Sequence, residues 1–197
     1  MMLWKRIDEL SVMRRLRLPK NATLSANDVT VTSTELSNLA GLTATGAELN
    51  RAADVSARIV NVTAATLTVT EAAHDGKVVT LNKADGQAVT LPAATGSGTK
   101  LHFILGTTVT SVGTTIKVAD ATDVMTGTAL LAQDAGDTAI MFETASTSDT
   151  ITFNGSTTGG IKGDSVELID IATNLWWVRV VGSGTSGEST PFSATVS

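Results

Sequence analysis

The sequence predicts a mainly β protein. It places a β-sandwich or jelly-roll-like domain at the C-terminal end, preceded by a short helical stalk and a basic N-terminal arm. The first observation is composition: the 197 residues include 33 threonines and 17 glycines, and only 17% are charged, which favours strands and turns over a helical enzyme. The second is a change near residue 61, after which short apolar segments alternate with turn signals. The third is that six of the 14 basic residues lie within residues 1–20.

Nine segments between residues 66 and 181 have the β-branched content or the alternation of strands. They are "TLTVT" (66–70), "KVVTLN" (77–82), "AVTLPA" (88–93), "KLHFILG" (100–106), "TTIKVA" (114–119), "TAIMFET" (138–144), "DTITFNG" (149–155), "SVELIDI" (165–171) and "LWWVRVV" (175–181). Turn signals such as "ADG", "SVG" and "KGD" separate them. The pattern predicts an all-β sandwich, jelly roll or barrel over residues 61–184.

The last two segments are predicted to form a hairpin, in which Trp176 and Trp177 point to opposite faces of the sheet. One tryptophan is therefore expected in the core, and the other is a candidate to cover a subunit interface. The following residues 185–197 are small and polar, which predicts a flexible tail. Phe192 is the one residue of the tail suited to anchoring it locally.

The first 20 residues are predicted to act as an attachment arm. Leu3, Ile7, Leu10 and Met13 fall on one face of a short amphipathic helix that Pro19 ends, and an arm that becomes ordered only on contact is an equal alternative. With six basic and two acidic residues, the arm carries a net charge of +4, whereas the other 177 residues carry 8 basic and 17 acidic residues, or −9. Such an arm suits an acidic partner: nucleic acid, a membrane or an acidic protein surface.

Residues 21–60 are predicted to hold a linker and two short helices. Thr32 with Glu35, and Thr45 with Glu48, each match a capping box, in which the threonine hydroxyl accepts from a backbone N–H and the glutamate reaches back to the cap. Helices this short are marginal alone in water, so their narrow apolar faces need partners. Those partners are either the β-domain or, as we favour, further copies of the chain around a symmetry axis.

The sequence contains few residues suited to catalysis. It has no cysteine, and its two histidines are His74, in a turn signal where solvation is the simplest reading, and His102, predicted to face outward from a strand. The acidic pairs Asp120 with Asp123, and Asp134 with Asp137, lack the spacing of a calcium loop and are read as solvated turns. No phosphate-binding or dinucleotide motif follows a strand. The prediction is no catalytic residue, no cofactor and no metal site.

No apolar run is long enough for a membrane span, and the basic N-terminus lacks the uninterrupted apolar core of a usual signal peptide. The protein is therefore expected to be made and kept in a cytoplasm until it is assembled into something larger. Its acidic body is not expected to bind nucleic acid.

Two stretches resemble known phage proteins. "TSTELSNLAGL" followed by "TATGAELNRAADVSARIV" resembles the ELN-type repeats of bacteriophage fibre and head-decoration proteins. "TLTVTEAAHDGKVVTLNKADGQAVTLPAATGSGTKLHFILGTTVTS" resembles a β-domain of phage and prophage structural proteins, so the resemblance covers roughly residues 32–112. It implies a virion structural protein, commonly a homotrimer, with an N-terminal attachment part and an outward β-domain. Two copies of the repeat are too few for a long shaft, which favours a capsid-surface head decoration or short head-fibre protein over a tail-fibre protein that recognises a host receptor.

The head-decoration reading assigns roles to residues near the N-terminus and names partners. The residues expected to attach to the major capsid protein, or to another virion protein, are Trp4, Lys5, Arg6, Ile7, Leu10, Arg14, Arg15 and Arg17. The residues expected to associate the stalk are Leu36, Leu39, Leu49 and Ala52. A host-surface glycan is a further candidate partner, and an enzyme such as a depolymerase is the least favoured alternative.

Overall fold

The computed structural model describes residues 23–26, 29–32, 58–134, 138–185 and 187–196. The chain divides into two compact units, Met1–Ala53 and Asp54–Ser197. In the first unit, β1 (Thr23–Ala26) and β2 (Val29–Thr32) form an antiparallel hairpin, which the prediction of a linker and helices over residues 21–60 did not include. The predicted arm and both predicted stalk helices lie outside the described residues.

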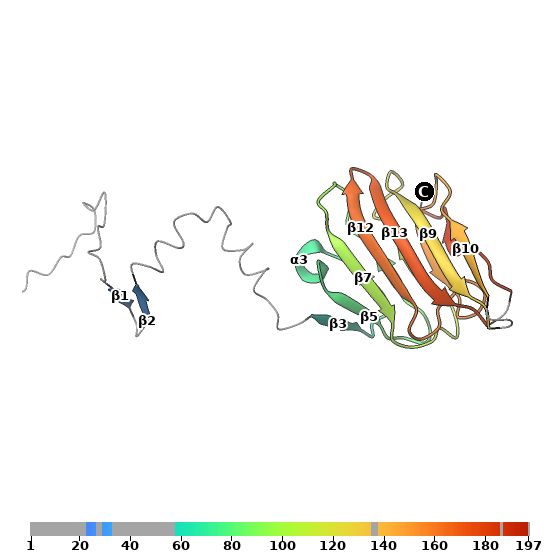
Figure 1. Cartoon of the computed structure of the whole chain (residues 1–197), viewed down its shortest axis with the longest axis horizontal. Helices are drawn as coiled ribbons and strands as arrows, with labels where there is room; N and C mark the ends of the chain where they lie inside the picture. Colours follow the sequence, from blue (N-terminus) through green and yellow to red (C-terminus); the bar gives the residue numbers. More distant parts are fainter. Residues whose placement is uncertain (1–22, 27–28, 33–57, 135–137, 186, 197) are drawn as a thin grey trace, which may run out of the picture. The chain divides into compact units, whose positions relative to one another are not determined.

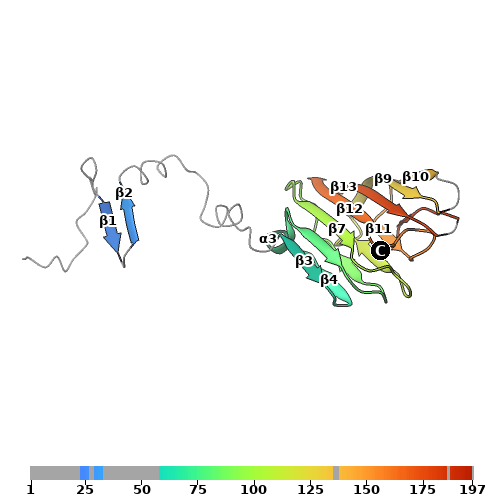
Figure 2. The same cartoon turned by 60° about the horizontal axis from the view of Figure 1, so that its bottom comes forward.

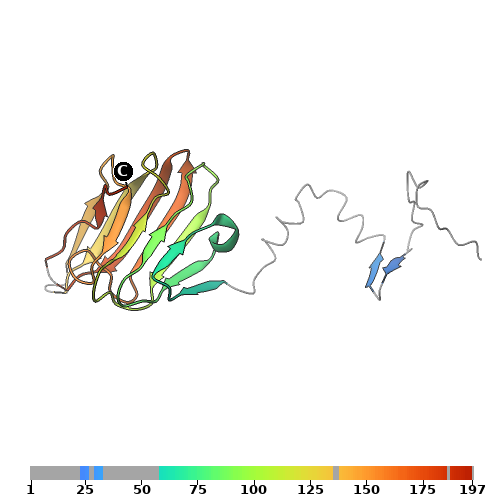
Figure 3. The ribbon, with the colours of Figure 1, turned by 180° about the vertical axis from the view of Figure 1, so that it is seen from behind.

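The second unit is a sandwich of two mixed β-sheets (Figures 1 and 2). The seven-stranded sheet has the order β10 (Ala139–Glu143), β9 (Val124–Ala132), β13 (Leu175–Ser183), β12 (Ser165–Ala172), β7 (Lys100–Leu105), β5 (Val78–Leu81) and β3 (Ile59–Val62). The five-stranded sheet, which faces the viewer in Figure 3, has the order β14 (Phe192–Ser193), β11 (Thr150–Phe153), β8 (Thr114–Lys117), β6 (Ala88–Thr90) and β4 (Thr66–Thr68). The short helix α3 (Glu71–His74) lies between β4 and β5 in the chain. The prediction of a mainly β, sandwich-like domain is confirmed.

Strict alternation along the strands builds the core. In β7, Leu101, Phe103 and Leu105 are buried while the residues between them are half-buried. Trp176 of β13 is fully buried in the same core, where Ile116 and other apolar residues of the five-stranded sheet meet it. Because successive strand residues point to opposite faces, each sheet commits one face to the core and leaves the other for other contacts.

The first six strands of the sandwich alternate between the two sheets. As a result β3, β5 and β7 lie parallel in one sheet, and β4, β6 and β8 lie parallel in the other. The chain therefore winds around the core before the antiparallel pairs β9 with β10 and β12 with β13 complete the larger sheet. The strand segments were visible in the sequence, but this winding was not.

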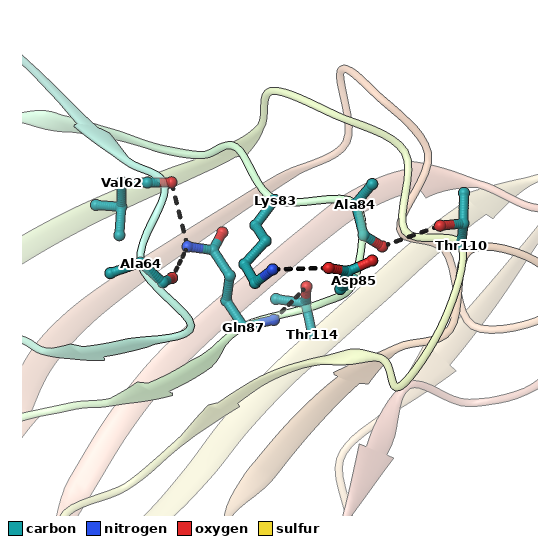
Figure 4. Close-up of polar contacts among 8 residues, drawn as sticks. All are labelled: Val62, Ala64, Lys83, Ala84, Asp85, Gln87, Thr110 and Thr114. Atoms are coloured by element: carbon teal, nitrogen blue, oxygen red, sulfur yellow. Dashed lines mark hydrogen bonds and ion pairs between the residues drawn. The ribbon is translucent and has the colours of Figure 1, made fainter.

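Gln87 links three consecutive passes of this winding (Figure 4). Its side-chain Nε2 donates to the carbonyl oxygen of Val62 at 3.1 Å and to that of Ala64 at 2.7 Å, at the end of β3 and just beyond it. Its backbone N–H donates to the hydroxyl of Thr114, the first residue of β8, at 3.2 Å. Gln87 is only 3% exposed, so its side chain forms these bonds from inside the domain, and the Val62 carbonyl also accepts the backbone N–H of Asn82 at 2.8 Å.

Replacing Gln87 with alanine is expected to lower the free energy of unfolding by about 1 kcal/mol, because the Ala64 carbonyl loses its side-chain donor while the Val62 carbonyl keeps the backbone N–H of Asn82 at 2.8 Å. Chemical denaturation followed by circular dichroism measures it. The matched control is Lys83→Ala: Lys83 pairs with Asp85 at 2.8 Å in the same view, but the Asp85 side chain is 70% exposed and the pair contributes little. Equal losses from both substitutions would contradict this account of Gln87.

The C-terminal segment differs from the flexible tail that its composition predicts. Phe192 is 7% exposed and belongs to β14, which pairs with β11. The Asp149 carboxylate also accepts the backbone N–H groups of Thr195 at 2.8 Å and Val196 at 3.1 Å. For the described residues of the tail, flexibility was the wrong prediction, because one buried aromatic and one buried carboxylate hold the segment; the anchoring role of Phe192 is confirmed.

Candidate binding face

The outer face of the seven-stranded sheet carries the side chains that the core does not use. The strand registers align these side chains in rows across neighbouring strands. One row holds Met141, Leu130, Val181, Ser165, Ile104 and Thr80; the next holds Glu143, Thr128, Arg179, Glu167, His102 and Val78; a third holds Thr126, Trp177, Ile169 and Lys100. We call this surface the outer face.

One end of the outer face is apolar. Met141 of β10, Leu130 of β9 and Val181 of β13 are direct neighbours in the register, with exposed fractions of 66%, 39% and 46%. Three adjacent exposed apolar side chains form a small contiguous strip rather than isolated surface residues.

The middle of the outer face is charged. Arg179 and Glu167 are opposite each other in the pair of β13 with β12, and the guanidinium Nη2 donates to the carboxylate at 2.6 Å. Both side chains are about half exposed, so the ion pair contributes little to stability. Glu167 therefore already has a basic partner on the outer face.

A shallow depression of about 370 Å³ lies on the same face, over β5, β7 and β12. It is lined by Gly76, Lys77, Val78, Lys100, Leu101, His102, Glu167, Leu168 and Ile169. The outward strand residues reach its surface, so the depression has an apolar floor bordered by the basic side chains of Lys77, Lys100 and His102 and by the acidic Glu167.

The two adjacent tryptophans confirm the prediction that they point to opposite faces. Trp176 is fully buried in the core, while Trp177 is half-buried on the outer face, in register with Thr126 and Ile169. A subunit interface over Trp177 stays a prediction.

Four buried aspartates hold loops in place, and we call them the loop-holding aspartates: Asp123, Asp149, Asp164 and Asp170. Asp170 is 1% exposed, and its carboxylate accepts the backbone N–H groups of Thr95 at 2.9 Å, Gly96 at 2.7 Å and Ser97 at 3.0 Å. It also accepts the Ser97 hydroxyl at 2.9 Å. One carboxylate thus organises the loop before β7.

Asp164 performs a similar task near the start of β12. One of its oxygens accepts the N–H groups of Gly160 at 2.8 Å and Ile161 at 3.0 Å, and the other accepts the N–H of Ser183 at 3.1 Å. Burial raises the pKa of Asp164 despite these donors, because loss of hydration penalises the charged form more than they stabilise it. For Asp170 burial also acts upward, but the surrounding donors outweigh it and lower the pKa below its ordinary value.

The histidines and the acidic turns differ in part from the sequence predictions. His74 is 7% exposed, and its Nδ1 lies 3.1 Å from the backbone nitrogen and 3.0 Å from the carbonyl oxygen of Thr70. A solvated turn was therefore wrong for His74, because the chain forms α3 and folds the ring back against its first turn. His102 does face outward, as predicted.

Asp120 and Asp123 also differ from each other in their environments. Asp120 caps an exposed turn by accepting the N–H and the hydroxyl of Thr122, which fits the prediction. Asp123 is 1% exposed and accepts the N–H of Ala94 at 3.1 Å, so a solvated turn was wrong for it. Burial raises the pKa of Asp123, more than the hydrogen bond from Ala94 lowers it.

Within the described ranges, no three histidine, aspartate or glutamate residues come close enough together to hold a metal ion. None of the helices in that part of the chain is long and apolar enough to cross a membrane.

The residues predicted for capsid attachment and for stalk association all lie outside the described part of the chain. The outer face was not predicted as a site, although the alternation in "KLHFILG", "SVELIDI" and "LWWVRVV" already showed which residues would face outward. Comparison of the chain with protein-family models, with curated proteins and with solved structures finds no match.

Proposed function

We propose that the protein is a non-enzymatic structural protein of a bacteriophage particle, a head decoration or short head-fibre protein attached through its N-terminal region. The observation that carries the proposal is the charge asymmetry, with +4 in residues 1–20 and −9 in the remainder. The division of the chain at Ala53 and Asp54 is in keeping with separate attachment and display parts. A basic segment on an acidic body is suited to docking on an acidic protein surface while the body stays in solvent.

The chemistry of the described polar residues supports a structural role. The loop-holding aspartates are engaged by backbone N–H groups, and His74 is engaged by its own helix. These are uses of polar groups that rigidify a domain, because each one satisfies a buried donor or acceptor within the fold. A rigid sandwich suits a domain displayed from a particle surface.

The partners in this proposal are the major capsid protein and further copies of the same chain, in a homotrimer. The arm residues from Trp4 to Arg17 make the capsid contact, and Leu36, Leu39, Leu49 and Ala52 associate the copies. A protein that binds only the assembled shell stabilises that shell by mass action. The expected location is the capsid surface of the virion.

Deleting residues 1–20 tests the attachment. The truncated protein is expected to keep its circular dichroism spectrum and thermal unfolding transition but to lose at least about tenfold in affinity for capsids, as measured by co-sedimentation. The matched point variants are the triple change Arg14→Gln, Arg15→Gln and Arg17→Gln, which should reproduce most of the loss, and Lys117→Gln on the sandwich, which should not. Undiminished capsid binding by the truncated protein would contradict the proposed attachment through residues 1–20.

A second candidate function is a tail-fibre or adsorption protein that recognises a host receptor. The observation in its favour is the outer face, where a depression with basic borders lies close to a half-buried tryptophan. The two candidate functions differ in where the protein lies on the particle: an adsorption protein lies on the tail, and a head decoration protein lies on the capsid.

A further inference from the structure

We infer that the depression on the outer face binds an acidic saccharide, a sugar chain whose rings carry carboxylate groups. The inference adds a ligand to the displayed domain and does not depend on which part of a particle carries the protein. It rests on the shape of the depression, on the side chains of Lys100 and His102, and on the pairing of strands β5, β7 and β12 beneath it.

The shape suits a sugar ring lying on a sheet. The volume of about 370 Å³ is in the lower part of the range of about 300–1,000 Å³ that small-ligand sites occupy. Val78 of β5 and Ile169 of β12 provide the apolar floor. Trp177 is the direct neighbour of Ile169 in the pair of β12 with β13, and this half-buried side chain offers an aromatic surface for a second ring.

The charges select an anion. Lys100 and His102 lie two residues apart on one face of β7, so their Cα atoms are roughly 7 Å apart. In the described part of the chain, neither the Lys100 ammonium nor the His102 ring takes part in a hydrogen bond or ion pair, whereas Glu167 opposite His102 is paired with Arg179. Lys77 adds a third basic side chain to the border.

The surrounding domain has the opposite charge. Residues 58–197 contain seven basic and thirteen acidic residues, a net charge of −6. The bases of the depression lie on an acidic domain, with the Asp75 carboxylate accepting the backbone N–H of Lys100 at 2.9 Å beside them. This arrangement favours short ligands over a long polyanion that would extend across the acidic remainder.

The backbone around the depression argues against the other anionic ligands. Each of β5, β7 and β12 is paired on both sides, so a peptide cannot add a strand there. Phosphate sites are typically built from backbone N–H groups at helix N-termini or in nests, but this depression lies over paired strands and presents side chains. Side chains that combine apolar surface with cations fit a carboxylated ring, which is apolar on one face and charged at its edge.

Titration of the full chain with oligogalacturonate tests the inference, with binding measured by calorimetry and by tryptophan fluorescence. We expect saturable binding with a dissociation constant of roughly 1 mM or below, weakened by added salt. Lys100→Gln should weaken it about tenfold, because it removes a charge-assisted hydrogen bond, and His102→Ala should weaken it about threefold, because it removes a hydrogen-bonding side chain. The matched control is Lys117→Gln, which removes an equally exposed lysine from β8 on the other sheet and should change nothing.

Several results would overturn the inference. The first is the absence of saturable binding to oligogalacturonate. Binding of neutral maltohexaose or of hexaglutamate as tight as that of oligogalacturonate, or displacement of oligogalacturonate by an equimolar amount of inorganic phosphate, would overturn it as well. So would a loss of affinity from Lys117→Gln as large as that from Lys100→Gln. Capsid co-sedimentation of Lys100→Gln should equal that of the unchanged protein, which keeps a failure here distinct from a failure of the proposed attachment.

Discussion

Replacing Gly127 with alanine is expected to lower the free energy of unfolding by about 4 kcal/mol, the combined scale of backbone strain and overpacking. Gly127 lies in β9, in register with Val178 of the parallel neighbour β13. A Cβ atom built at Gly127 overlaps the carbonyl oxygen of Val178, and the residue has a φ of +152°. The obstacle is backbone in the middle of a seven-stranded sheet, so relief requires β9 and β13 to move apart.

Urea denaturation of the purified variant measures the loss. Gly187→Ala is the matched control, because Gly187 has no neighbouring atom within 4 Å of the added carbon and is exposed. A Gly127→Ala variant as stable as the Gly187→Ala control would show that β9 and β13 are not packed as described.

Replacing Asp170 with alanine is expected to cost about 3 kcal/mol, roughly 1 kcal/mol for each backbone N–H that loses its acceptor. The three groups belong to Thr95, Gly96 and Ser97, and the loop they form precedes β7. Loss of order should therefore extend to the depression at the N-terminal end of β7, and hydrogen exchange of residues 94–99 should accelerate. Asp120→Ala, in an exposed turn, is the control and should leave stability almost unchanged.

The same aspartate predicts a pH dependence. Its pKa is lowered in the folded protein from the ordinary value of 3.8, so the ionised form stabilises the fold above that value. The stability is lost as the pH falls from 3.8 through the folded pKa. The difference in unfolding free energy between the unchanged protein and Asp170→Asn should be constant near neutral pH and shrink below pH 4, and a difference that grows in acid would contradict the assignment.

The strands that the sequence revealed are those with uninterrupted alternation. All nine predicted segments contain a strand, from β4 to β13. The long strand β9 was missed because its sequence, "VMTGTALLA", contains few β-branched residues and a central glycine, and a glycine is more typical of a turn than of a strand. That glycine is present because of the close approach of Val178, which is a tertiary contact and leaves no local signal.

In the candidate site, too, the features set by local sequence could be predicted, and those set by tertiary contacts could not. The outward position of His102 and the opposite faces of Trp176 and Trp177 follow from a two-residue period, and both predictions are confirmed. The depression itself depends on the parallel pairing of β5 with β7, which results from the winding of the chain between two sheets. The burial of Asp123 could not be seen either, since its partner Ala94 is 29 residues away in the chain.

The location of the protein on an assembled particle tests the central proposal most directly. Gold-labelled antibody raised against residues 58–197, applied to intact particles and imaged by electron microscopy, should label the head surface at many sites per particle. The label should disappear from particles assembled with the chain that lacks residues 1–20. Label confined to the tail tip would favour the adsorption function instead, and particles without any label would contradict a role on the virion surface.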